Sequence, residues 1–427
     1  MSTLPDLEVA DLRPPPRCVP FESRATHAPW FDRVDPFWLG YGANPHYSWY
    51  SAYRYEPHWV LTPRGPQLVR RRTNDFESTS QKRFHVPGGR VERIAAVLAA
   101  WRVLTTQQIC AMVSMDDSRV SRTLRAMMSA GLVERTQMTA RFEISTNTPF
   151  LWRPRVTSVE WRQWLGSLDT RQHTAITMGV EGGASGHDRH DVLAAEVALR
   201  WAEITPSIQA ILGERAASAE QLLGDHPDVR SRGDAVLVRD DGLRIVLEIT
   251  TQPALGAVRT KMARWGRLLG ERGGHHRTGI VVVFLAAAAH DHTGKQGASL
   301  TVIRRSLERA MTVEAVGDGR PVSPATVNQA RRSVMVAHWQ DWFPAPWYVS
   351  QRFADLAADV SLGDGRFVSV ALGRPDVGVA GGIPGAPFAP PGGNWQSIRR
   401  ARRHVPAVPR WLEQPVLHRI SPQESAP

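Results

Sequence analysis

Residues 233–250 read GDAVLVRDDGLRIVLEIT, and this stretch decides the fold. Two apolar runs rich in Val, Ile and Leu flank an Asp-Asp-Gly turn at 240–242, which is typical of a β-hairpin. Strands are therefore predicted over residues 234–238 and 243–250. Asp234 opens the first strand and Glu248 lies near the end of the second. Because paired strands can present their side chains on the same face of a sheet, we expect the two carboxylates to converge.

The patterns on either side of the hairpin extend it into a mixed α/β domain. Apolar residues recur at steps of three and four positions before and after the hairpin, which predicts amphipathic helices. The expected elements are a helix over residues 191–204, a short strand over 208–212, a helix over 254–269 and a buried strand over 280–284. The resulting order is helix, strand, strand, strand, helix, strand, and we assign it to a domain spanning residues 190–290.

This order, with one acid on each of two paired strands, resembles the PD-(D/E)XK nuclease core, a restriction-endonuclease-like αβββαβ fold. Carboxylate oxygens are preferred ligands of hard divalent cations, so Asp234 and Glu248 are the expected ligands of a Mg or Mn ion. Such an ion lowers the pKa of bound water and neutralises charge on a scissile phosphate. The resemblance implies an additional acid, Glu196, on the first helix. It also implies a lysine two residues after the second acid, but Thr250 stands there.

Lys261, on the helix that follows the hairpin, is the candidate replacement for the missing lysine. It lies thirteen residues after Glu248, and the chain has only two other lysines. A positioned cation stabilises the negative charge that develops in the transition state of phosphodiester hydrolysis. The predicted catalytic residues are Asp234, Glu248, Lys261 and Glu196. Three interpretations stay open: an active nuclease, an inactive domain that retains the nuclease fold, and a different α/β domain.

A second unit, over residues 88–146, precedes this domain. Its pattern predicts helices over 90–101, 106–113 and 116–130, then a hairpin over 132–136 and 141–145. Three helices followed by a hairpin resemble a winged helix-turn-helix domain, whose third helix lies in the major groove of DNA. The expected DNA contacts are Arg119, Ser121, Arg122 and Arg125 on the third helix, with Arg135 and Arg141 on the wing. A small helical domain used for protein contacts is the alternative.

Taken together, the two units resemble the replication-relaxation family of actinobacterial plasmids and mobile elements. The resemblance rests on the stretches HDVLAAEVALR (190–200), GERAA (213–217), GDAVLV (233–238), VLEIT (246–250) and KMARW (261–265). It covers about residues 90–285 and implies a role in processing or copying plasmid-like DNA. The site residues that it carries over are Glu196, Glu214, Asp234, Glu248 and Lys261.

The composition fits a nucleic-acid partner and excludes several other classes of protein. Lys and Arg total 52 against 41 Asp and Glu, a formal net charge of +11, which favours polyanions, although GC-rich coding also enriches arginine. Cys18 and Cys110 provide neither a cysteine zinc site nor a disulfide framework.

The longest apolar run, 280–289, is about half of a membrane span, and no signal peptide is visible. We therefore expect a cytoplasmic protein without a membrane partner. NTPase, serine hydrolase, zincin and dinucleotide-binding motifs are absent from the sequence.

The remaining segments are assigned by composition. Residues 1–87 are rich in proline and aromatic side chains, which favours an irregular strap or a surface for a protein partner. The other assignments are a bridge over 147–189, a helical extension over 291–345 with helices at 299–311 and 324–342, and a Pro/Gly-rich segment over 346–427 with a basic tail at 398–404.

The sequence therefore predicts a DNA-binding protein of a plasmid or mobile element, with a metal-dependent phosphodiesterase domain that acts in replication or transfer. The first alternative is a non-catalytic DNA-binding regulator of replication or transcription with a degenerate nuclease fold. The second alternative is a structural or assembly protein of a mobile element or phage. Winged-helix proteins often dimerise, so a homodimer is a further expectation.

Overall fold

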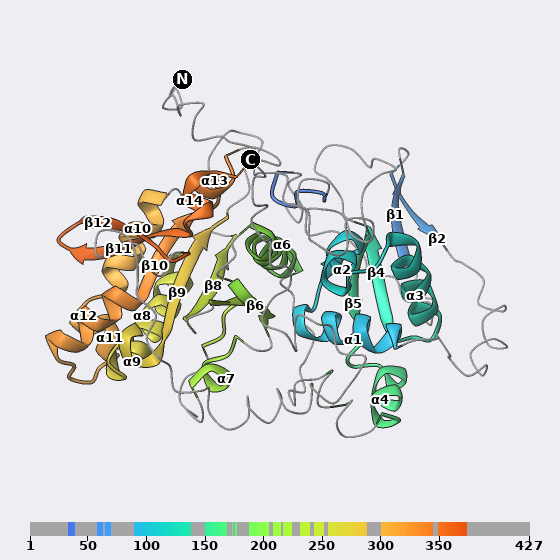
Figure 1. Cartoon of the computed structure of the whole chain (residues 1–427), viewed down its shortest axis with the longest axis horizontal. Helices are drawn as coiled ribbons and strands as arrows, with labels where there is room; N and C mark the ends of the chain where they lie inside the picture. The colour runs from blue at the N-terminus through green and yellow to red at the C-terminus, as the bar shows by residue number, and fades with distance from the viewer. Residues whose placement is uncertain are drawn as a thin grey trace, which may run out of the picture.

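Figure 1 shows the computed structural model of the chain. The structure describes residues 33–38, 58–62, 65–69, 89–137, 150–168, 173, 176, 188–204, 208–214, 217–223, 231–239, 243–251, 255–287, 300–344 and 349–373. Within these ranges the chain forms three sheets, of seven, three and two strands, together with helices. The expected mixed α/β class is confirmed.

The largest sheet has the strand order β12-β11-β10-β9-β8-β7-β6. Its strands are β6 (Ile208–Gly213), β7 (Ala235–Arg239), β8 (Arg244–Thr250), β9 (Ile280–Ala286), β10 (Val334–His338), β11 (Ala357–Gly363) and β12 (Arg366–Ala371). Strands β8, β9 and β10 run parallel to one another, and the pairs on either side of them are antiparallel. Every residue of β8 and β9 is buried, because central strands of such a sheet are covered on both faces.

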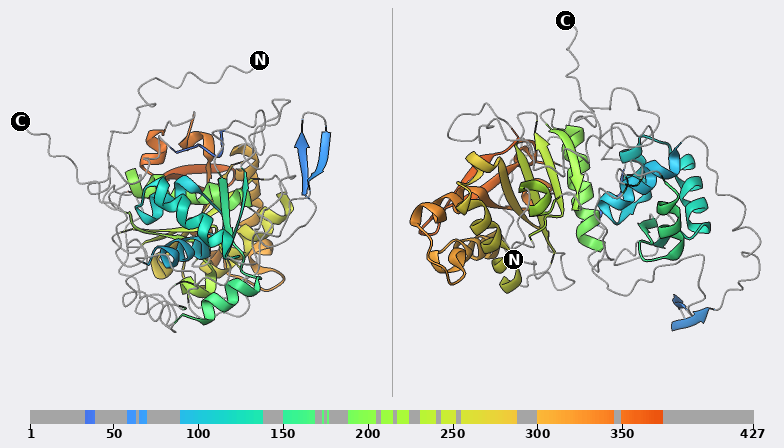
Figure 2. Two further views of the ribbon diagram at one scale, coloured as in Figure 1. Left: turned by 90° about the vertical axis from the view of Figure 1, so that its right-hand side faces the viewer. Right: turned by 90° about the horizontal axis from the view of Figure 1, so that it is seen from below.

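Helices cover both faces of this sheet, as Figures 1 and 2 show. One face carries α6 (Asp188–Ile204), and the other carries α8 (Leu255–Glu271), α10 (Leu300–Ala310), α11 (Val313–Gly317) and α12 (Pro324–Ser333). Apart from two short helices, α7 (Ala219–Leu223) and α9 (His275–Thr278), the order α6-β6-β7-β8-α8-β9 is the one expected for residues 190–290.

Helix α8 packs tightly on the sheet and against the neighbouring helix α12. A Cβ on Gly270 would lie 2.5 Å from the backbone oxygen of Thr326 in α12. Gly270 therefore allows a close approach of the two helices that a side chain would prevent. On the sheet side, Met262 and Trp265 are fully buried. This packing fixes the direction in which the remaining side chains of α8 point.

A separate three-helix unit lies beyond α6. Its three helices are α1 (Arg90–Trp101), α2 (Thr106–Val113) and α3 (Asp117–Ser129). They are accompanied by the small sheet β3-β5-β4, with β3 (Leu104–Thr105), β4 (Val133–Gln137) and β5 (Phe150–Pro154), and the chain continues into α4 (Val159–Gly166). The Thr105 side chain caps α2 by accepting from Gln108 N, and Asp116 caps α3 by accepting from Arg119 N. The three helices predicted for residues 90–130 are confirmed.

Strand β4 pairs with a strand that the sequence did not predict. The expected hairpin partner, 141–145, lies outside the described residues. The described partner is β5, which runs antiparallel to β4 with Trp152 opposite Arg135. The indole nitrogen of Trp152 also donates to Thr106 Oγ1 at 2.9 Å. Part of the segment assigned as a bridge over 147–189 therefore belongs to the three-helix unit.

The single helix predicted over residues 324–342 is wrong. Helix α12 ends at Ser333, and the chain continues as β10 and then as a short helix, α13 (Trp339–Trp342). Strand β10 pairs in parallel with β9, and its first four residues are buried. The β-branched residues Val334 and Val336 suit this position in a sheet. The sequence pattern concealed the change because apolar residues continue at helical spacing through this segment.

The C-terminal segment contains more regular structure than its composition indicated. Helix α14 (Gln351–Ala354) and strands β11 and β12 extend the described fold to residue 373. Buried Asp359 on β11 accepts from Arg304 Nη2 at 2.6 Å and from Arg352 Nη2 at 3.1 Å. The predicted basic tail at 398–404 lies outside the described residues.

The aromatic N-terminal segment contains an antiparallel pair that its prolines did not lead us to expect. Strands β1 (His58–Thr62) and β2 (Gly65–Val69) pair with each other, apart from the other two sheets (Figure 2). Within the described ranges, none of the helices combines the length and the apolar character that crossing a bilayer requires.

Candidate functional site

The two acids of the predicted site lie next to each other on neighbouring strands. Ala235 of β7 pairs with Leu247 of β8, so Asp234, which directly precedes β7, stands beside Glu248. The backbone fixes Asp234 on both sides: its N–H donates to Leu247 O at 2.8 Å, and its Oδ2 accepts from Ile249 N at 2.5 Å. Glu248 is only 2% exposed. The hairpin therefore brings two carboxylates together in a largely buried place.

Helix α8 supplies a partner to each oxygen of Glu248. Lys261 Nζ forms an ion pair with Glu248 Oε2, and Trp265 Nε1 donates to Glu248 Oε1 at 2.7 Å. Residues four positions apart on a helix share one face, so a single face of α8 holds the carboxylate from both sides. The side chain of Lys261 is 40% exposed, so this residue lies where the buried pair meets the surface.

Burial dominates the electrostatics of the pair. Burial and the nearby Asp234 together raise the pKa of Glu248 to about 8, against the opposing effect of Lys261. Burial also raises the pKa of Asp234, while Lys261 and His190 oppose that shift. For Lys261, burial disfavours the charged form, but Glu248 and Asp234 outweigh it and the pKa of the lysine is raised. One ammonium therefore does not fully compensate the two buried carboxylates.

His190 and Thr251 add polar groups beside Asp234. His190, in the first turn of α6, has its Nδ1 4.0 Å from Asp234 Oδ2, and its Nε2 lies 2.5 Å from Thr251 Oγ1. The sequence pattern placed neither residue in the site: the glycine-rich stretch before His190 is typical of a solvated loop and a helix start, and Thr251 belongs to no motif. The missed Trp265 had a detectable signal, since it lies four residues after Lys261 on the same predicted helix.

Glu214 lies at the end of β6 and acts on the same site through its charge. It raises the pKa of both Asp234 and Lys261, as a nearby negative charge does. Its carboxylate forms an ion pair with Arg102, the residue after α1, and lies 3.7 Å from Arg232 Nη1. Arg102 has a φ of 69°, which is uncommon for a residue with a side chain. An arginine of the three-helix unit thus reaches an acid beside the candidate site.

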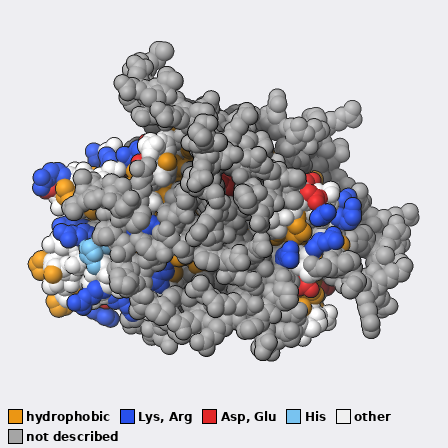
Figure 3. Space-filling model, viewed as in Figure 1, with side chains coloured by type: hydrophobic (Ala, Val, Ile, Leu, Met, Phe, Trp, Pro, Cys, Tyr) orange, Lys and Arg blue, Asp and Glu red, His pale blue; other side chains and the backbone are white. Residues whose placement is uncertain are grey.

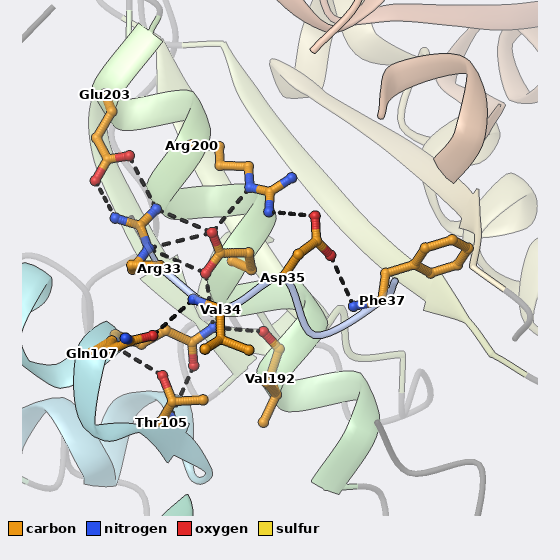
Figure 4. A network of polar contacts seen from close by, with 11 residues as sticks. Arg33, Val34, Asp35, Phe37, Thr105, Gln107, Val192, Arg200 and Glu203 are labelled. Atoms are coloured by element: carbon orange, nitrogen blue, oxygen red, sulfur yellow. Dashed lines mark hydrogen bonds and ion pairs between the residues drawn. The ribbon is translucent and has the colours of Figure 1, made fainter. Parts of the chain in front are cut away.

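Glu196 does not join the other predicted site residues. Its carboxylate, fully buried in α6, accepts from Arg33 Nη2 at 3.2 Å, from Arg200 Nε at 3.0 Å and from Gln108 Nε2 at 3.2 Å (Figure 4). Burial would raise the pKa of Glu196, but the two arginines outweigh burial and lower it. Glu196 follows His190 by six residues, which on an α-helix is a rotation of about 120° and a rise of about 9 Å. Its side chain therefore points away from Asp234 and Glu248.

The segment 33–38 completes the cluster around Glu196, which joins the three-helix unit to the α/β domain. Arg33 also donates from Nη1 to Glu203 Oε1 at 2.5 Å, and Asp35 accepts from Arg200 Nη2 at 2.8 Å. The backbone N–H of Val34 donates to the Gln107 side chain of α2 at 2.8 Å. Figure 4 shows the segment lying between α2 and α6. Its Phe37 ring stacks on Trp339 with centroids 5.0 Å apart.

The donor chemistry at Asp234 and Glu248 fits a divalent cation. Their oxygens are hard ligands, and a bound cation would stabilise the charged forms that burial disfavours when it raises both pKa values. Among the described residues no three His, Cys, Asp or Glu side chains are grouped closely enough to hold a metal ion by themselves. Mg²⁺ suits such a place, because it keeps several waters and commonly binds through one or two carboxylates plus substrate phosphate.

The predicted DNA-contacting residues of α3 lie on one outward face. Arg119, Arg122 and Arg125 are exposed, whereas Val120, Leu124 and Met127 are buried against the rest of the unit. Ser121 is half-buried between them. The wing arginine Arg135 packs its guanidinium 4.5 Å from the centre of the Phe150 ring. Arg141 lies outside the described residues.

Comparisons with protein-family models, with curated proteins and with solved structures each found no match. The functional interpretation therefore depends on the geometry of the two sites themselves.

Proposed function

We propose that this chain is a DNA-binding protein of a plasmid or mobile element whose α/β domain is a PD-(D/E)XK-like, metal-dependent phosphodiesterase. The observation that carries the proposal is the buried pair of Asp234 and Glu248, held on adjacent strands beside Lys261. Paired carboxylates with raised pKa values, next to a lysine and close to solvent, are more typical of a functional site than of a structural ion pair.

Each residue of the site has a role in this proposal. Asp234 and Glu248 would hold a Mg or Mn ion, which supplies a nucleophilic water and neutralises charge on the phosphate. Lys261, with its exposed side chain, would contact the phosphate oxygens and stabilise the charge that develops on them. Trp265 would orient Glu248 through its 2.7 Å hydrogen bond. His190 would exchange protons with solvent beside Asp234.

The three-helix unit would bind the DNA as a winged helix-turn-helix. The exposed arginine face of α3 supports this role, since guanidinium groups suit both phosphates and guanine edges. The tight packing of the opposite face, through Val120 and Leu124, supports a rigid presentation of the arginines. The ion pair of Arg102 with Glu214 would connect the DNA-binding unit to the domain that contains the candidate cleavage site.

A non-catalytic DNA-binding regulator with a degenerate nuclease fold is the second candidate. Two observations favour it. Lys261 pairs directly with Glu248 rather than standing free of the acids, and the position two residues after Glu248 is Thr250 instead of lysine. A direct ion pair of this kind can also be a purely structural contact. Cleavage assays separate the two candidates.

The test is incubation of supercoiled plasmid with wild-type protein, Asp234→Asn and the control Glu314→Gln, each with Mg²⁺, Mn²⁺ or EDTA. Glu314 is an exposed acid of α11 that makes no ion pair within the described ranges, and its variant changes charge by the same amount. We expect the wild type and the control to nick or cut the plasmid with metal, and Asp234→Asn to bind DNA without cutting it. Plasmid that is retarded but never cut by any of the three proteins would favour the regulator.

A further inference from the structure

Most of the excess positive charge of the described fold lies on the helical layer over one face of the large sheet. The ranges 255–287 and 300–333, which contain α8 and α10 to α12, hold eleven arginines and one lysine against four acids. That net charge of +8 compares with +11 for the whole chain. The layer therefore carries a positive potential that the three-helix unit does not explain.

Part of this charge has no structural role in the described fold. In α10, Ile303 and Leu307 face the sheet, while Arg305 and Arg309 lie four residues apart on the opposite, exposed face. Neither arginine forms an ion pair within the described ranges, unlike their neighbour Arg304, which binds Asp359. Like charges at this spacing destabilise a helix slightly. The helix dipole accounts for Arg309 in the last turn but not for Arg305.

Exposed arginines also stand on α8 and α12, and α8 packs against both α10 and α12. Arg264 of α8 and Arg332 of α12 are exposed and form no ion pair with a described residue. Their helices are locked together by the close contact of Gly270 with Thr326, so these side chains are presented by a rigid support. An exposed set of arginines on packed helices, without acidic partners, matches the electrostatic footprint of a phosphate-binding surface.

This surface and the arginine face of α3 lie at opposite ends of the molecule. Figure 3 shows Lys and Arg side chains gathered at both ends, over α10 and α12 on one side and over α3 on the other. Between α10 and α3 stand the sheet, α6 and α2, so about four packing distances of roughly 10 Å each separate the two faces. Both arginine faces point away from the helices and strands that lie between them, so a straight duplex cannot contact both.

We propose that the exposed arginines of α10, α8 and α12 form a second surface for duplex DNA, so that one chain bridges two DNA segments. The proposal rests on the DNA binding proposed above but not on cleavage. Wrapping one duplex around both ends is disfavoured, because DNA has a persistence length of about 150 base pairs and resists such a bend. Two separate segments satisfy both surfaces without deforming the DNA.

The experiment is a bridging assay with two short duplexes of about 20 base pairs, which are too stiff to wrap around the protein. One duplex is fixed to beads, the other carries a fluorophore, and the protein-dependent capture of the second is measured. The variant Arg305→Gln with Arg309→Gln is compared with Arg162→Glu, which makes the same change in net charge at an exposed position of α4. Thermal melting confirms that both variants are folded.

We expect the wild type and Arg162→Glu to capture the second duplex, and the α10 variant to capture about tenfold less while its affinity for a single duplex through α3 stays within about twofold. The slope of log K against log salt for the second duplex should fall by about 1.8, the value for two lost phosphate contacts. Arg122→Ala with Arg125→Ala should also abolish capture, since bridging needs both surfaces.

Capture by the α10 variant at the wild-type level would overturn the proposal. So would a bridged complex with two chains per pair of duplexes in mass photometry, because a dimer of α3 surfaces would then explain it. A protein that binds one duplex but captures no second one refutes only the bridging inference. A protein that binds no DNA at all refutes the proposed function as well.

Discussion

The chain contains two clusters of buried carboxylates, and the pKa values of Glu196 and Glu248, one from each cluster, shift in opposite directions. In the first, Glu196 is completely buried, yet its pKa is lowered, because Arg33 and Arg200 surround it. In the second, Glu248 is similarly buried, and its pKa is raised to about 8, because Lys261 does not outweigh burial and the nearby Asp234. The number of cations beside a buried acid, rather than its burial, therefore separates a structural acid from a candidate functional one.

The cluster around Glu196 contains two further carboxylates, those of Glu203 and Asp35. Burial raises the pKa of Glu203 more than Arg33 lowers it. The carboxylates of Asp35, Glu196 and Glu203 share the two guanidinium groups of Arg33 and Arg200, so each buried arginine has direct acidic partners. In the cluster of Asp234 and Glu248, by contrast, the ammonium of Lys261 faces two carboxylates, and a bound cation would stabilise their charged forms.

Breaking the balanced cluster should have the largest effect on stability. We expect Glu196→Ala to lower the free energy of unfolding by about 3–5 kcal/mol, because it leaves Arg33 and Arg200 buried without their shared partner. Urea denaturation followed by circular dichroism measures this loss. The exposed control Glu314→Ala should stay within about 0.5 kcal/mol of the wild type. A loss as small as the control's would mean that the cluster contributes little.

Adding a cation should stabilise the second cluster by a smaller amount. At a Mn²⁺ concentration about 100 times its dissociation constant, we expect the free energy of unfolding to rise by about 2.7 kcal/mol. Thermal melting with Mn²⁺ and with EDTA measures the difference. Asp234→Asn should abolish the shift, and Glu196→Gln should retain it. A shift that survives in Asp234→Asn would place the metal elsewhere.

The pH dependence of stability should distinguish the clusters next. Glu248 binds a proton more tightly in the folded chain, where its pKa is about 8, than in the unfolded chain, where it is about 4.5. Its contribution therefore favours folding at low pH and is lost as the pH rises towards 8, by up to about 1.4 kcal/mol per pH unit. Glu248→Gln should remove this slope. Denaturation between pH 5 and pH 8, without metal, provides the measurement, and an identical slope in the variant would contradict the assignment.

The smallest expected effect concerns the indole that holds Glu248. Trp265→Phe retains most of the buried ring and removes only the 2.7 Å hydrogen bond, so we expect a loss of about 1 kcal/mol in stability. Because the freed carboxylate loses a donor to its charged form, the pKa of Glu248 should rise further. The pH at which cleavage reaches half of its maximum should rise with it. A variant with unchanged stability and an unchanged pH profile would show that Trp265 does not position the acid.

Local signals predicted the α/β domain and half of its site well. The hairpin at 233–250 has its turn, its strands and both acids within 18 residues, so its pairing could be inferred without the rest of the chain. Lys261 was singled out by the resemblance to nucleases that carry their lysine on the following helix and by the scarcity of lysine in the chain. The strand β10 was missed because its parallel partner β9 lies some fifty residues earlier. The assignment of Glu196 to the site failed for the same reason, since its partner Arg33 is 163 residues away.

The position of Arg33 in the chain has a consequence for how the protein is made. Synthesis proceeds from the N-terminus at about 5–20 residues per second, so Arg33 is translated roughly 8–30 seconds before Glu196. The aromatic partner of Phe37, Trp339, follows still later. The three-helix unit depends on nearer neighbours and can assemble while translation continues. The junction between the two units is therefore among the last parts of the native structure to form on the ribosome.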